Sequence, residues 1–148
     1  MRRLLYIIVL VALLAVPVRR ADVGNILPIE LVMVYTKGNG VEIRTDTGNW
    51  GIGRNLEEAA KNMKDSASDE LFLHTAQYLI LSGEGISAEA LRGMFKSDIY
   101  VCRGNREIDL MEAVEYLSEH VPECRLKDVK QGIILPEIRK TANGYRMS

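Results

Sequence analysis

The sequence predicts an α/β or α+β domain, in which a single-layer mixed β-sheet carries three packed helices. Strand-like segments alternate with helical ones, each helical segment has one apolar face, and glycine- or asparagine-containing turns separate them. An amphipathic helix must bury its apolar face against another element, and the sheet offers that surface. We therefore expect about four to six strands in one sheet, which is an ordinary size.

A β-hairpin is predicted first. Residues 29–36 are rich in β-branched and aromatic side chains, and Lys37–Gly40 supplies a turn. Residues 41–45 alternate apolar and polar side chains, as expected of a half-exposed return strand. A polar cluster at 47–49 then lets the chain bend into 50–53.

Two helices and two strands are predicted in the middle of the chain. Asn55 is a typical N-cap, with Glu58 three residues later as its capping-box partner, and favours a helix over 56–66. The apolar segment 71–81 predicts a loop or short helix followed by a central strand. Ser87 caps a helix over 88–95, and a short strand over 99–102 follows.

The last third predicts a strong helix and a terminal hairpin. Asp109 opens the helix and Pro122 ends it. A helical turn is expected within 125–131. The segments 133–140 and 144–147 predict a hairpin whose first strand Pro136 restricts to a sheet edge.

Residues 1–21 are predicted to be a signal peptide or an N-terminal membrane anchor, and 22–148 a single mixed α/β domain. Arginines at 2, 3, 19 and 20 flank the apolar run Leu4–Val18, a pattern typical of export. Ala21 is small enough for a cleavage site, whereas the flanking arginines also suit an uncleaved anchor. A cytoplasmic protein with a buried apolar helix is the third alternative. The predicted location is extracytoplasmic.

Charge and cysteine content exclude some functions. Without the four leader arginines, the chain has 15 basic and 20 acidic side chains, which gives a net charge of about −5. Such a domain has no electrostatic footprint for nucleic acid, so no nucleic-acid partner is expected. Cys102 and Cys124 are the only cysteines of the chain. We expect them to be either two partly buried free thiols or one disulfide.

No motif predicts catalysis, a cofactor or a metal. The glycines of Gly51-x-Gly53 lack the rest of a dinucleotide fingerprint and predict a tight turn. His74 and His120 have no metal-ligand spacing to each other. The acidic residues 112, 115 and 119 are expected to form a solvated helix face. The protein is therefore predicted not to be an enzyme.

Two segments carry a family resemblance. Gly51–Asn62 and Asp69–Glu84 combine a glycine turn, an Asn-Leu-x-x-Ala helix, a Leu-Phe-Leu-His segment and an apolar strand with a Ser-Gly-Glu exit. They are similar to the N-terminal domain of the Ger(x)C spore-germination proteins. The resemblance implies an extracytoplasmic, membrane-associated, non-enzymatic domain acting beside a nutrient-receptor membrane partner. Family members carry a lipidated cysteine directly after the leader, and this chain has none there.

We expect an exported or membrane-anchored domain that acts by protein–protein contact in the cell envelope, with spore germination as the process that the resemblance implies. Trp50 and the predicted edge containing Pro136 and Ile138 are the candidate interaction residues. The membrane is a further partner if the leader stays uncleaved. The alternatives are an exported small-ligand-binding domain and a secreted hydrolase, which would place His74 or His120 beside a nucleophile or an acid.

Overall fold

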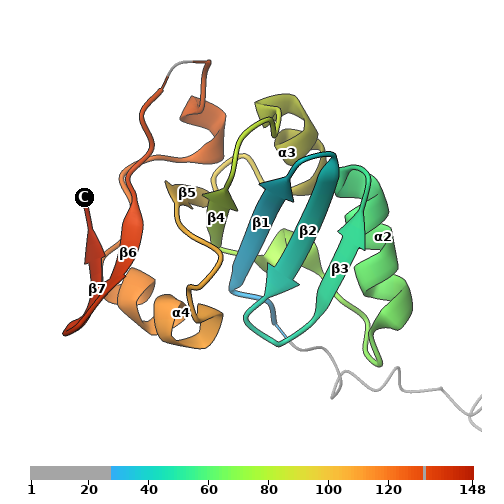
Figure 1. Ribbon diagram of the computed structural model, residues 1–148, viewed down its shortest axis with the longest axis horizontal. Coiled ribbons are helices and arrows are strands. Elements are labelled where there is room, and N and C mark those ends of the chain that lie inside the picture. Colours follow the sequence, from blue (N-terminus) through green and yellow to red (C-terminus); the bar gives the residue numbers. More distant parts are fainter. Residues whose placement is uncertain (1–27, 132) are drawn as a thin grey trace, which may run out of the picture.

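A mixed five-stranded sheet in the order β3-β2-β1-β4-β5 forms the centre of the computed structural model, which describes residues 28–131 and 133–148 (Figure 1). The antiparallel β1, β2 and β3 form one half, and β4 and β5 continue it parallel to β1. The strands of this sheet are β1 (Leu31–Lys37), β2 (Gly40–Thr45), β3 (Trp50–Gly53), β4 (Tyr78–Ser82) and β5 (Tyr100–Arg103).

In the described residues, three α-helices and a second, two-stranded sheet complete the α+β fold. They are α2 (Leu56–Ser66), α3 (Ala88–Met94), α4 (Leu110–Glu119), β6 (Ile138–Thr141) and β7 (Gly144–Met147), with short 3-10 helices η2 (Leu73–Thr75) and η3 (Leu126–Asp128). The predicted mixed sheet with three helices is confirmed. The terminal hairpin, however, forms its own sheet.

Local capping chemistry sets the helix starts as predicted. The Asn55 side chain accepts a hydrogen bond from Glu58 N (2.8 Å), and Ser87 and Asp109 cap α3 and α4 in the same way. The Glu58 carboxylate reaches back to Arg54 N (2.8 Å) and not to the N-cap residue itself. Its contact with the Arg54 guanidinium holds the pKa of Glu58 below its usual value.

The helices lie on opposite faces of the sheet. Apolar side chains of α2 and α3 pack with Val32, Val34, Leu79 and Val101, and those of α4 pack with Leu31, Met33, Ile80 and Cys102 on the other face. β1 and β4 are therefore buried on both faces, which explains their continuous apolar sequences. The α4-side core includes no residue of β2 or β3.

Close packing of α2 on β3 depends on two glycines. A Cβ atom at Gly51 would lie 2.5 Å from Met63 N, and one at Gly53 would lie 2.7 Å from the carbonyl carbon of Glu58. Glycine lets a helix backbone approach a strand at this distance. These glycines, which carry part of the family resemblance, are therefore structural.

The leader prediction for 1–21 lies outside the described residues, as do 22–27. Within the described ranges, none of the helices combines the length and the apolar composition needed to span a membrane.

Candidate functional site

A groove at the carboxyl-terminal side of the molecule is the first candidate site in the described residues. Its volume is about 770 Å³. We call it the C-terminal groove. It is lined by the end of α4 and the residues after it, by η3, and by the segments before β6 and at the end of β7: His120, Val121, Glu123, Cys124, Asp128, Ile133, Ile134, Leu135, Pro136, Met147 and Ser148.

The rim of the C-terminal groove is apolar and exposed. Ile134 is 94% exposed, and Val121 and Ile133 are also large exposed hydrophobic residues. Glu123 and Asp128 line the same groove and, within the described part of the chain, neither forms an ion pair. The groove therefore combines an apolar surface with two carboxylates that have no ion-pair partner among the described residues.

His120, Cys124 and Asp128 all line the groove, yet their contacts do not form an activated nucleophile. The His120 ring stacks on Tyr116 at 4.3 Å, and its Nδ1 lies 3.2 Å from the Tyr116 carbonyl oxygen. The Cys124 thiol donates to the Arg125 carbonyl (3.7 Å). Burial, together with the Asp128 charge, raises the pKa of Cys124, which keeps it a neutral thiol at neutral pH.

Other predicted polar sites stay apart. His74 lies in η2 and lines a different cavity, with Glu57 and Lys64. In the part of the chain that the structure describes, no group of three His, Cys, Asp or Glu side chains could hold a metal ion. The acidic residues 112, 115 and 119 are exposed as predicted.

Cys102 and Cys124 are free thiols, so the disulfide alternative is not realised in the structure. The two residues lie in different environments: Cys102 is fully buried in the α4-side core, whereas Cys124 lines the groove. Burial raises the pKa of the Cys102 thiol to about 12.

The prediction of a free docking edge around Pro136 and Ile138 is wrong. Arg103 N of β5 donates to the Pro136 carbonyl (2.7 Å), and Glu137 exchanges two backbone hydrogen bonds with Ser148. The Ile138 side chain is completely buried in the α4-side core. Of this predicted set, Pro136 alone contributes to the groove.

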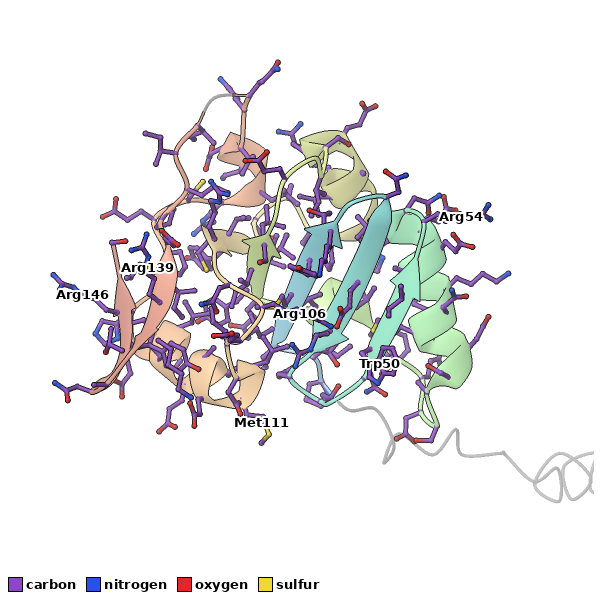
Figure 2. The ribbon with its side chains drawn as sticks, viewed as in Figure 1. Trp50, Arg54, Arg106, Met111, Arg139 and Arg146 are labelled. Atoms are coloured by element: carbon purple, nitrogen blue, oxygen red, sulfur yellow. The ribbon has the colours of Figure 1, made fainter. Side chains whose placement is uncertain are left out.

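A second candidate surface consists of the part of the sheet that α4 leaves uncovered, the adjoining loop before α4 and the first turn of α4. We call it the open face and define it by Glu42, Arg44, Trp50, Ile52, Arg106, Glu107 and Met111. Strand alternation directs Glu42, Arg44, Trp50 and Ile52 to this face, because they pair across β2 and β3 and alternate with Ile43 and Gly51 of the α2 side. Figure 2 shows Trp50 and Met111 at the lower end of the molecule.

Arg106 ties the loop before α4 to the open face. Its guanidinium contacts the Glu42 carboxylate at 2.9 Å and lies 5.2 Å from the centroid of the Tyr35 ring. Arg44 Nη1 donates to the Arg106 carbonyl (3.1 Å). Trp50 is exposed on this surface (59%), together with Ile52 (52%) and Met111 (74%).

Comparison with known proteins gives no relative to name. No family model, curated protein or solved structure matches the chain.

Proposed function

We propose that this protein acts outside the cytoplasm as a non-enzymatic protein-binding domain of the cell envelope, and that the C-terminal groove is its docking site. The observation that carries the proposal is the juxtaposition of exposed Val121, Ile133 and Ile134 with Glu123 and Asp128 around one cavity. Among the described residues, neither acidic side chain forms an ion pair. The arginine-flanked apolar leader supports export, either as a cleaved signal peptide or as an anchor.

The occupant that fits the C-terminal groove is a peptide segment with apolar side chains and a lysine or arginine. When a partner covers exposed aliphatic side chains on the rim, the binding free energy becomes more favourable, because burial removes apolar area from water. A basic side chain of the partner would meet Glu123 and Asp128, giving the charge complementarity that selects partners. The resemblance to the Ger(x)C proteins supports a membrane protein of spore germination as this partner.

Photo-crosslinking in intact cells tests the docking site. A photoreactive residue at Ile134 is expected to give one discrete adduct with an envelope protein, and the same residue at exposed Lys61 on α2 is the matched control. Asp128→Lys should abolish the Ile134 adduct while the folded content stays unchanged. Binding of the purified partner should weaken in the same variant, and an adduct indifferent to Asp128→Lys would contradict the proposed groove.

Export is tested separately. Protease added to intact cells should degrade the domain, and sequencing its amino terminus reports whether residues 1–21 are removed. Full-length protein recovered as soluble material from the cytosol would refute export.

Small-ligand binding at the same groove is the second candidate, because about 770 Å³ lies within the usual range of roughly 300–1,000 Å³ for ligand pockets. Such pockets enclose most of their ligand, whereas Ile134 stands almost entirely in solvent. Native mass spectrometry of the protein purified from its host distinguishes the two candidates. A small molecule retained by the wild type and lost in Asp128→Lys would favour the ligand.

A further inference from the structure

The end of the open face that contains Trp50 and Met111 lies beside the start of β1. Asp46 connects the two features: it accepts a hydrogen bond from Glu30 N (3.2 Å) and donates one from its own N to the Leu31 carbonyl (3.1 Å). Asp46 also lines a small cleft together with Trp50 and Met111. In Figure 1 the start of β1 lies at the lower end of the domain, the end at which Figure 2 places Trp50 and Met111.

The chain length between the apolar leader and the domain limits where this end can lie. Nine residues, 19–27, separate Val18 from Pro28. Fully extended, the ten Cα–Cα steps between Val18 and Pro28 span at most about 36 Å. If Leu4–Val18 is held in a bilayer, Pro28 must therefore remain within that distance of the lipid surface, and the neighbouring Trp50 and Met111 share this constraint.

The chemistry of the open face suits the interface between lipid headgroups and hydrocarbon. Trp50, Ile52 and Met111 present apolar side chains, and tryptophan is enriched at this depth because its ring is apolar with one polar edge. The charged residues of the open face balance, since Glu42 and Glu107 match Arg44 and Arg106. Electrostatic attraction to anionic lipid would therefore contribute little to membrane contact at this surface.

We propose that the open face contacts the bilayer surface through Trp50, Ile52 and Met111, which orients the anchored domain with its C-terminal groove directed away from the membrane. This inference rests on the proposed export and specifically on an uncleaved leader. The tether supplies a high effective concentration, so three apolar side chains suffice without strong affinity of their own. In Figure 1, η3 and the described residues that follow it lie at the upper end, whereas β1 starts at the lower end; Asp128 of η3 and residues 133–136 line the groove.

Trp50 is the only tryptophan of the chain, so intrinsic tryptophan fluorescence reports on this surface alone. The full chain is reconstituted into phosphatidylcholine vesicles, with and without bromine on the acyl chains near the headgroup. We expect brominated lipid to quench Trp50 and vesicle binding to shift its emission to shorter wavelength. Raising the salt concentration should leave both effects unchanged, because the surface charges balance.

The control moves the reporter to the groove. In the double variant Trp50→Phe, Val121→Trp, the tryptophan lies on the rim of the C-terminal groove and should escape quenching. Ile52→Ser and Met111→Ser should each reduce the quenching of Trp50, with far-ultraviolet circular dichroism checking the fold.

Vesicle flotation separates the two ways in which the inference can fail. A chain that does not float with the vesicles would refute the anchor and the orientation together. A chain that floats while Trp50 stays unquenched, or is quenched no more than the tryptophan at 121, would overturn the orientation and leave the proposed export standing.

Discussion

Gly51→Ala should strongly destabilise the domain, although it adds one methyl group. The new Cβ would meet the Ala59 carbonyl oxygen and lie 2.5 Å from Met63 N, both backbone atoms of α2. The helix cannot move away freely, because Leu56, Ala59, Ala60 and Met63 are buried against the sheet. Overpacking of this kind costs about 1–3 kcal/mol, and rigid backbone neighbours place the expected loss near about 3 kcal/mol.

Gly93→Ala is the matched control, since it makes the same chemical change inside a helix. Nothing lies within 4 Å of a Cβ atom at Gly93, and its φ is not positive. Alanine should stabilise α3 there by about 0.5–1 kcal/mol. Urea denaturation of residues 22–148 measures both changes. At roughly 4 °C per kcal/mol, the melting temperatures should fall by about 12 °C and rise by about 2–4 °C respectively. Equal effects at the two glycines would show that α2 does not lie against β3 as described.

Three further predictions concern buried groups. Ile138→Ala should lower the free energy of unfolding by about 2–5 kcal/mol, because the side chain is completely buried. A loss below about 0.5 kcal/mol, as is usual for an exposed residue, would contradict the place of Ile138 in the core. Thiol labelling of the native protein should modify half-buried Cys124 before Cys102, and both should react after denaturation; fewer than two reactive thiols in denaturant would reveal a disulfide. Burial raises the pKa of the Cys102 thiol from 9.0 to about 12. As the pH rises above about 9, the thiol therefore ionises in the unfolded chain but not in the folded one. The free energy of unfolding should then fall by up to about 1.4 kcal/mol per pH unit. Cys102→Ala should reduce that slope in denaturation measured from pH 8 upward, and an unchanged slope would assign it to other groups.

Local signals predicted most of the secondary structure. Asn55, Ser87 and Asp109 accept backbone hydrogen bonds at the helix starts where the sequence placed them, since capping depends on residues only two or three positions apart. The same holds for the turn between β6 and β7. Where a long-range contact decides the outcome, prediction was weaker: β6 begins at Ile138 and not at 133.

The candidate surfaces were only partly predictable. The C-terminal groove joins the end of α4, η3, the segment before β6 and the end of β7, and no periodic pattern marks residues brought together from such separate segments. Trp50 was predicted to be exposed, and the alternation of Trp50 and Ile52 with Gly51 and Gly53 does hold a readable signal. The glycines mark the face that a helix approaches, so the large side chains must occupy the other face.

Sheet dimensions explain why that other face stays open. Five strands about 4.8 Å apart give a sheet about 19 Å wide between its outer strand axes, and a helix with its side chains is about 10–12 Å across. Two helices, α2 and α3, can cover one face, but α4 alone can cover only two or three strands. Because α4 follows β5, it packs over β1, β4 and β5 and leaves β2 and β3 bare. A sequence with this topology avoids an exposed apolar surface by placing polar residues there. This chain does so at Glu42 and Arg44 and departs from it at Trp50 and Ile52, the two positions nearest the free edge of the sheet. The proposed contact with the bilayer surface would bury these two side chains.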